Sequence, residues 1–208
     1  MPSAITHALV GGALSTLAPR KFRGVRLGVV LAVAAAIPDL DVLAFRFGIP
    51  YSHPLGHRGL SHSLPCALLF AVVIWAWLVA GGRRLSRSSV ELFVVVFVAC
   101  ASHGFLDAFT DAGLGVGFFI PFSDQRYFFP WRPIRTSPLS IGAFFSGEGI
   151  AILRSEAISV GVPTGLMLAL CALVRRMAAA GLSNTPLQPI QAAHANGGSE
   201  PSRGGPHG

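Results

Sequence analysis

The segment Ser-His-Gly-Phe-Leu-Asp, residues 102–107, stands at the far end of an apolar run that begins near Val90. A helix through it puts His103 and Asp107 on one face, four residues apart, with Asp111 one turn further along. A histidine and a carboxylate at this spacing can ligate one metal ion. Such groups are costly in a hydrophobic segment unless they are paired. We therefore expect a metal site at a membrane surface; the alternative is a polar stripe that lines a helix contact or a water-filled cleft.

Two acidic residues lie at the end of an earlier apolar run, in the tetrapeptide Pro38-Asp39-Leu40-Asp41. On an irregular turn, both carboxylates can reach one or two cations. The alternative is that Asp39 caps a helix that continues to Phe47, and that Asp41 favours the positive end of that helix.

Histidines stand near two other apolar segments. His57 and His62 lie in a loop just before an apolar run, and Arg58 follows His57. The guanidinium of Arg58 can hold an anionic oxygen as a planar fork. The alternative is an interfacial loop that touches lipid headgroups. His7 opens the first apolar segment and is a further candidate ligand, with a chance polar residue at that place as its alternative.

The segments that must position these residues are apolar and long. The 208-residue chain is 52% hydrophobic and 12% charged, with a mean hydropathy of +0.60, whereas soluble domains average about 25% charged residues. Because a span needs about 20 residues, the sequence predicts an all-α, polytopic transmembrane helix bundle. The predicted apolar segments are residues 4–19, 25–45, 62–80, 90–110 and 157–174. The first is short enough to be a half-embedded helix instead.

Two parts of the chain are not apolar. Residues 111–156 are rich in glycine, proline and aromatic residues, which predicts a surface excursion within a membrane domain of residues 1–180. Tyr127 and Trp131 in it are of the type that lies at membrane interfaces, so we expect a lid on the bilayer that also covers the metal site. Residues 181–208 predict a disordered tail, because they are polar and lack periodicity.

The basic residues share one side of the membrane if all five segments span it. The formal net charge of +7 would indicate nucleic-acid binding in a soluble protein. Here the arginines flank apolar runs, so no nucleic-acid partner is expected. The positive-inside rule makes their side cytoplasmic and puts every His/Asp candidate of the membrane region on the extracytoplasmic side. The basic residues that fall on this one side, between or after the apolar segments, are Arg20, Lys21, Arg23, Arg26, Arg83, Arg84, Arg87, Arg175 and Arg176.

These motifs, taken in order over about residues 3–160, resemble the pattern of a known family. It is the YdjM/YbcI family of bacterial inner-membrane proteins, which are described as membrane-bound metal-dependent hydrolases. The resemblance implies a multi-span protein of the bacterial inner membrane with a metal-dependent hydrolase site, and it does not name a substrate. The matching motifs are Thr6-His7 with Gly11-Gly12, Pro38-Asp39-Leu40-Asp41, His57-Arg58-Gly59 with Ser61-His62-Ser63, Ser102-His103 with Leu106-Asp107 and Thr110, and the stretch from Arg126-Tyr127-Phe128 to Pro138.

The expected function is a membrane-bound metal-dependent hydrolase that acts on a phosphoester or lipid-like substrate through a metal-activated water. Among metals, Zn²⁺ suits mixed imidazole and carboxylate ligands best, with Mn²⁺ or Fe²⁺ as alternatives. One or two ions are expected, and membrane lipid is the expected partner. A metal or proton transporter and a non-catalytic membrane scaffold are the alternative classes. The predicted metal ligands are His7, Asp39, Asp41, His57, His62, His103 and Asp107; the predicted catalytic groups are Asp41 or Asp111 as general base and Arg58, which steadies negative charge.

Overall fold

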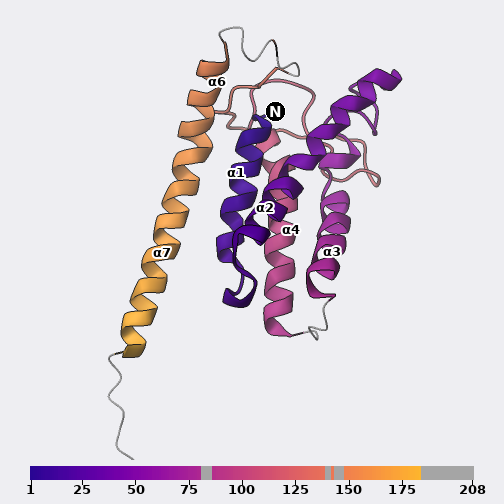
Figure 1. Cartoon of the computed structure of the whole chain (residues 1–208). Coiled ribbons are helices and arrows are strands. Elements are labelled where there is room, and N and C mark those ends of the chain that lie inside the picture. Colours follow the sequence, from indigo (N-terminus) through magenta and orange to yellow (C-terminus); the bar gives the residue numbers. More distant parts are fainter. Residues whose placement is uncertain (81–85, 139–141, 143–147, 184–208) are drawn as a thin grey trace, which may run out of the picture. The chain divides into compact units, whose positions relative to one another are not determined.

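A computed structural model describes residues 1–80, 86–138, 142 and 148–183, and its regular elements are all helical (Figure 1). Within these residues the only β-type pairings are two isolated bridges, Thr110 with Ile134 and Val116 with Tyr127. In chain order the elements are α1 (Ala4–Leu14), η1 (Ser15–Leu17), η2 (Arg20–Phe22), α2 (Val25–Ala36), η3 (Ile37–Phe47), η4 (Leu60–His62), α3 (Leu64–Val79), α4 (Arg87–Ala108), α6 (Gly149–Glu156), η6 (Ala157–Gly161) and α7 (Val162–Ser183).

Three helical stretches are long and apolar enough to cross a membrane: Val25–Phe47, Arg87–Ala108 and Gly149–Ala179. Two shorter apolar helices, Ala4–Leu17 and Leu64–Val79, accompany them. The prediction of an all-α polytopic bundle with about five apolar segments is confirmed. The chain divides into two compact units, Met1–Leu173 and Val174–Gly208, and the site described below lies wholly in the first.

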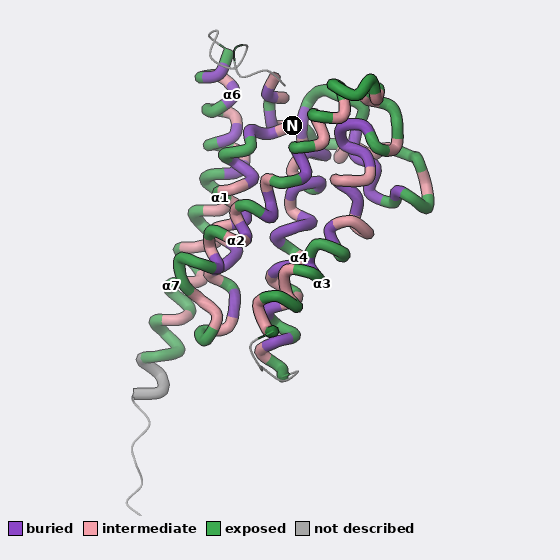
Figure 2. Tube along the Cα trace, turned by 45° about the vertical axis from the view of Figure 1, so that its right-hand side comes forward, coloured by how far each residue is buried: buried purple, intermediate pink, exposed green. Residues whose placement is uncertain are grey.

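Helices α1, α2, α3 and α4 supply nearly all of the buried apolar cluster of the first unit, and buried residues recur along each of them (Figure 2). The closest approach is between α1 and α2, and it depends on Gly11. A Cβ at this position would lie 2.3 Å from the carbonyl oxygen of Leu31 and 2.6 Å from the Cβ of Ala35. Only a glycine admits this contact, so α2 can bring Ala35 and the residues after it close to the first turn of α1.

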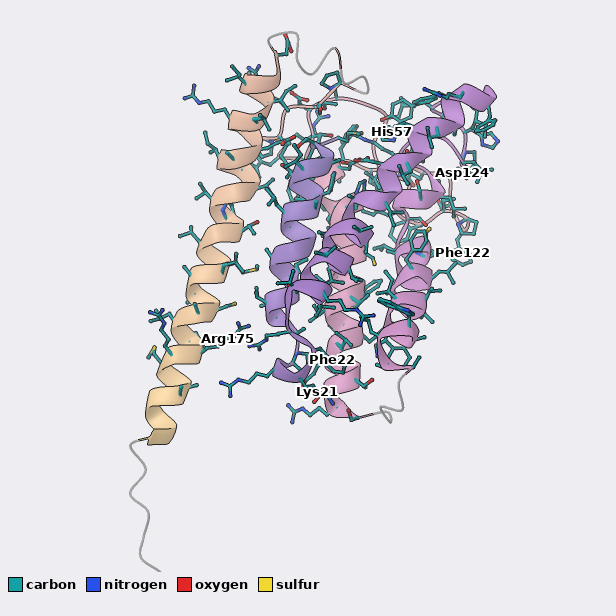
Figure 3. The ribbon with its side chains drawn as sticks, in the orientation of Figure 1. Lys21, Phe22, His57, Phe122, Asp124 and Arg175 are labelled. Atoms are coloured by element: carbon teal, nitrogen blue, oxygen red, sulfur yellow. The ribbon has the colours of Figure 1, made fainter. Side chains whose placement is uncertain are left out.

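The loop after α1, which contains Lys21, and the candidate ligands lie at opposite ends of this unit. Lys21 and Phe22 lie at one end, and His57 and Asp124 lie at the other (Figure 3). The ammonium of Lys21 donates a 3.4 Å hydrogen bond to Ser86 Oγ, which ties the loop after α1 to the start of α4. Among the other predicted basic positions, Arg83 and Arg84 lie outside the described residues, and Arg175 and Arg176 belong to the second unit.

Two boundaries of helical structure differ from the apolar pattern. The last apolar segment was predicted as residues 157–174, whereas helical structure begins at Gly149, inside the predicted excursion 111–156 where short helices are expected, and continues through the π-helical turn η6. Helix α4 ends at Ala108, so Asp111 does not continue the stripe of His103 and Asp107. The predicted disordered tail lies outside the described residues from 184 onward.

The excursion after α4 packs back on the end of the bundle that carries the histidines. The backbone N–H of Gly117 donates to Arg58 O, and the N–H of Leu64 donates to Phe118 O, both at 2.9 Å. The guanidinium of Arg126 donates to the carbonyl oxygens of His57, Tyr51 and His53. These bonds fasten the loop before α3 to the excursion and cover the site from that end.

Candidate metal centre

His103 and Asp107 form one wall of the candidate site, on the last two turns of α4. Both side chains are fully buried, and their spacing of four residues puts them on the same helical face, as predicted. Gly104 between them lets the neighbouring loop approach, because a Cβ there would lie 2.6 Å from the carbonyl oxygen of His62. A glycine in the helix is therefore what brings His62 to the same face.

The remaining walls come from the ends of three other segments. Asp39 lies in η3, where α2 tightens after Ala36 and Pro38 occupies the first turn. His62 ends η4, directly before Ser63, whose side chain caps α3 by accepting from Cys66 N–H. His7 lies in the first turn of α1, behind the N-cap Ser3.

Four of these residues offer ligand atoms that all lie within 4.8 Å of one another: Asp39, His62, His103 and Asp107. The Nε2 atoms of His62 and His103 are 2.9 Å apart. His62 Nε2 is 3.3 Å from Asp107 Oδ2, and His103 Nε2 is 3.3 Å from Asp39 Oδ1. A tetrahedron with ligand bonds of about 2.0–2.2 Å has edges of about 3.3–3.6 Å. The separations of 2.9, 3.3 and 3.3 Å, with 3.8 Å from His62 Nε2 to Asp39 Oδ1, lie on both sides of this range, so small shifts would bring the four atoms around one ion.

Both histidines are oriented by bonds to their other ring nitrogen. His103 Nδ1 lies 2.6 Å from the carbonyl oxygen of Ala35, which can only accept, so Nδ1 carries the proton. His62 Nδ1 faces Asp41 Oδ2 at 3.1 Å and Ser61 Oγ at 2.9 Å. Backbone carbonyls and carboxylates in this position are the usual outer partners of metal-bound histidines, because they leave the Nε2 lone pair free for the ion.

The carboxylates of Asp39 and Asp107 are buried without hydrogen-bond partners among the described residues, and so are both ring nitrogens of His7. The two carboxylates face imidazole nitrogens at ion-pair distances instead. For example, Asp107 Oδ1 lies 3.4 Å from His7 Nε2. The His7 ring also stacks on His103 with centroids 3.8 Å apart. A buried polar atom without a partner costs about 1–3 kcal/mol, and a bound cation would remove that cost for several atoms at once.

The local charge also favours a cation. Asp39, Asp41 and Asp107 carry three negative charges against one positive charge on Arg58, which leaves two in excess when the histidines are neutral. Burial alone would lower the pKa of His62, but the carboxylates of Asp107, Asp39 and Asp41 around its ring outweigh burial and hold that pKa well above the usual value. A site that stabilises an imidazolium in this way is one that attracts positive charge.

Arg58 is fully buried behind Asp107. Its Nε lies 3.1 Å from Asp107 Oδ2, and its two terminal nitrogens donate to Ala112 O and Thr110 Oγ1, each at 2.9 Å. The guanidinium thus holds Asp107 in place and joins it to the excursion. The role predicted for Arg58 in steadying negative charge on a substrate stays a prediction.

Asp41 and His57 form a second group with His62. Asp41 Oδ1 lies 2.7 Å from His57 Nδ1, while Oδ2 accepts from Ser61 Oγ and from Arg58 N–H and faces His62. Four partners occupy the roughly four lone-pair positions of a carboxylate. This favours an orienting role for Asp41; its predicted roles as ligand or general base, and that of His57 as ligand, stay predictions.

Asp111 lies outside both groups. It is exposed, and its Oδ1 accepts from the N–H and the hydroxyl of Thr136 at 2.9 and 2.8 Å, which fastens the excursion to the end of α4. Its predicted role as general base stays a prediction.

Sequence reasoning missed Glu156, which is 2% exposed at the junction of α6 and η6. Its carboxylate accepts from Ser3 N–H, Ser3 Oγ and Thr6 Oγ1. The three bonds hold the last long helix against the first turn of α1, next to His7. In the sequence, Glu156 is recognisable only as a single acidic residue directly before an apolar run. It falls within the predicted excursion.

Fold and site together define a polytopic α-helical membrane protein with a buried histidine–aspartate cluster at one end of its bundle. The chain matches the family described as YdjM inner membrane protein over residues 1–182. It is 36% identical over 169 residues to the inner membrane protein YbcI of Escherichia coli (strain K12), an alignment that covers 81% of this chain and 95% of that protein. No solved structure matches. The chain belongs to the YdjM inner membrane protein family.

Proposed function

We propose that the protein is a membrane-bound metal-dependent hydrolase whose metal ligands are Asp39, His62, His103 and Asp107. The observation that carries the proposal is the set of four ligand atoms within 4.8 Å of one another, buried in an apolar bundle with carboxylates that lack other partners. Mixed imidazole and carboxylate donors favour Zn²⁺, with Mn²⁺ or Fe²⁺ as alternatives. Such an ion, when bound, lowers the pKa of a water molecule to about 7 and polarises the bond under attack.

The chain's own residues would then supply orientation and proton handling. Asp41 fixes the ring of His62, and Ala35 O fixes that of His103. His7 lies against both Asp107 and His103 and has no hydrogen-bond partner among the described residues, so it is available as a further ligand or as a proton acceptor. The excursion, fastened by Arg126 over His57, would exclude bulk water and admit substrate when it opens.

The proposed substrate is a phosphoester or a lipid-like molecule, and the proposed side is extracytoplasmic. Lys21, in the loop after α1, lies at the end opposite the site (Figure 3), and its bond to Ser86 joins that loop to the start of α4. By the positive-inside rule this end faces the cytoplasm. A substrate would then reach the metal from the outer leaflet or the aqueous phase beside it.

A metal or proton transporter is the second candidate. It needs titratable groups along a path through the bilayer. In the described part of the first unit, the buried His and Asp residues instead gather at the end of α4 and beside the first turn of α1. This placement favours a site that works at one surface, and a non-catalytic scaffold would hold no metal there.

The test is metal analysis of the detergent-purified protein by inductively coupled plasma mass spectrometry, followed by assays on phosphodiester and phospholipid substrates. We expect stoichiometric metal, hydrolysis that a chelator abolishes, and recovery with Zn²⁺ or Mn²⁺. Exposed His53 gives a matched control: His103→Ala should lose metal and activity, and His53→Ala should keep both. Absence of metal under metal-replete conditions overturns the proposal; metal without hydrolysis, together with metal uptake in vesicles, would identify a transporter.

A further inference from the structure

An apolar hollow of about 480 Å³ lies between α1 and the last long helix. Ile5, Leu9 and Ala13 of α1 line one side, and Val160 and Leu168 line the other. A second apolar hollow adjoins it across the ridge formed by Ile5, Leu9 and Ala13, towards α2. We refer to the first hollow as the α1–α7 groove. All of its lining residues belong to the first compact unit.

Small residues create the groove. Gly161 and Gly165 line it on the last long helix, and a Cβ added at Gly165 would meet nothing within 4 Å. Two glycines one helical turn apart remove side chains from the face that α7 turns towards α1. The space is therefore built into the sequence of this helix.

One part of the groove is polar and lies beside the metal centre. Thr6 and Glu156 line the groove, and the Thr6 hydroxyl donates to Glu156 Oε2 at 2.7 Å. The next residue along α1 is His7, whose Nε2 lies 3.4 Å from Asp107 Oδ1. The groove thus runs from the hydrophobic part of the bundle to within one residue of the candidate metal centre.

The geometry points to an acyl chain of a bilayer lipid as the occupant of the α1–α7 groove. The groove lies along the candidate span Gly149–Ala179. Only 6% of the 18-residue apolar window in this span is buried within the protein, so most of that window meets the bilayer. Among the groove's lining residues only Thr6, Thr164 and Glu156 have polar side chains, and Thr6 and Glu156 are hydrogen-bonded to each other. The occupant must therefore be apolar, and it must be narrow enough to lie between two helices. The chain's own residues 184–208 are dominated by Gly, Pro, Ser, Asn and Gln and do not fit such a surface.

If the protein is the proposed hydrolase, a lipid bound in the α1–α7 groove is its substrate class, and this part of the inference rests on the proposed function. A lipid whose chain occupies the groove would have its ester-bearing end near His7, beside the metal centre. The binding of the chain does not itself depend on catalysis, so the two claims can fail separately.

The test uses the full-length protein in vesicles of phosphatidylethanolamine and phosphatidylglycerol that contain a phospholipid with a photoreactive diazirine in its acyl chain. Crosslinked sites are mapped by mass spectrometry. We expect labelling concentrated on the groove faces of α1 and of α6 to α7. Ala157→Leu and Gly165→Leu, which fill the groove, should reduce this labelling at least threefold. The matched control is Ala169→Leu, an exposed position of the same helix outside both hollows, and it should leave labelling unchanged.

Labelling spread evenly over the lipid-facing sides of α3 and α4, or unaffected by both groove-filling variants, overturns the inference. A protein–protein crosslink through the groove would show that a second copy occupies it and would also overturn it. Metal content is measured on the same samples. Groove labelling without metal leaves the lipid site standing and removes the proposed hydrolase, whereas metal and hydrolysis without groove labelling do the reverse.

Discussion

The Nε2 atoms of His62 and His103 face each other at 2.9 Å in the interior of the bundle. The acceptors at their Nδ1 atoms, a carboxylate of Asp41 and the carbonyl of Ala35, place a proton on Nδ1 in both rings. Two Nε2 lone pairs then point at each other, an arrangement that repels unless a proton or a cation lies between them. With the carboxylates of Asp39 and Asp107 beside the same point, a bound metal ion would satisfy all four groups together.

Removal of either facing imidazole should abolish stoichiometric metal binding. His62→Ala and His103→Ala each delete one of four ligand atoms, and a buried site with three ligands loses both affinity and geometry. We expect metal content to fall from about one ion per chain to below one fifth of that, measured on purified protein. His53→Ala should retain wild-type content, because His53 is exposed and its Nδ1 accepts the N–H of Leu55, away from the candidate ligands. Equal loss in the control would assign the effect to folding.

Asp41→Asn should weaken metal binding without abolishing it. The amide keeps the shape of the side chain but removes the negative charge that faces His62 Nδ1 and His57 Nδ1. Loss of such an outer partner typically lowers metal affinity about 10–100-fold. Competition with a chelator of known affinity measures the change, and Asp124→Asn, at an exposed position, is the control. If Asp41 were itself a ligand, saturating metal would fail to restore full occupancy.

Much of the fold and part of the site could be predicted from the sequence, for different reasons. The helices were recognised by the length of their apolar runs, because a membrane span requires a long uncharged segment. As a result, α3 and α4 begin and end within three residues of the predicted segments. His103 and Asp107 share a helical face by spacing alone. Asp39 and His62 were grouped with them only through the distribution of basic residues, which placed the ends of different segments on one side.

The partners of neighbouring residues were less predictable than their grouping. Asp39 was favoured over Asp41 as a ligand, but the sequence could not show that the turn of η3 sends Asp39 towards His103 and Asp41 towards His57. Asp111 was predicted to lie on the same helical face as His103 and Asp107, because nothing in the local sequence predicts that α4 ends at Ala108. The helix ends there because Thr110 bonds back to Asp107 and forms a β-bridge with Ile134, which is distant in the sequence. Glu156 was missed because its donors, Ser3 and Thr6, lie about 150 residues away.

Arg58→Met should destabilise the protein far more than Arg87→Met. Arg58 is fully buried against Asp107, and breaking a buried ion pair by removing one partner typically costs about 3–5 kcal/mol. Arg87 pairs with Glu91 on the helix surface, where both side chains are largely exposed and such pairs contribute little. Thermal unfolding in detergent, followed by intrinsic fluorescence, should show a large fall in Tm for the first variant only. Similar Tm values for both would contradict a buried ion pair at Arg58.

Gly11→Ala should impair both stability and metal binding, whereas Gly12→Ala should leave both near wild type. A Cβ at Gly11 would lie 2.3 Å from Leu31 O and 2.6 Å from Ala35 Cβ, so α1 and α2 must move apart. A Cβ at Gly12 meets its nearest atoms at 3.7 and 3.8 Å, which is ordinary contact. Because the carbonyl of Ala35 holds His103 Nδ1 at 2.6 Å, a shift of α2 away from α1 also releases the ring of His103. We therefore expect Gly11→Ala to lower Tm and to weaken metal affinity in the chelator assay, although it touches no ligand. If Tm fell but metal affinity stayed unchanged, the link from helix packing through Ala35 to His103 would be broken.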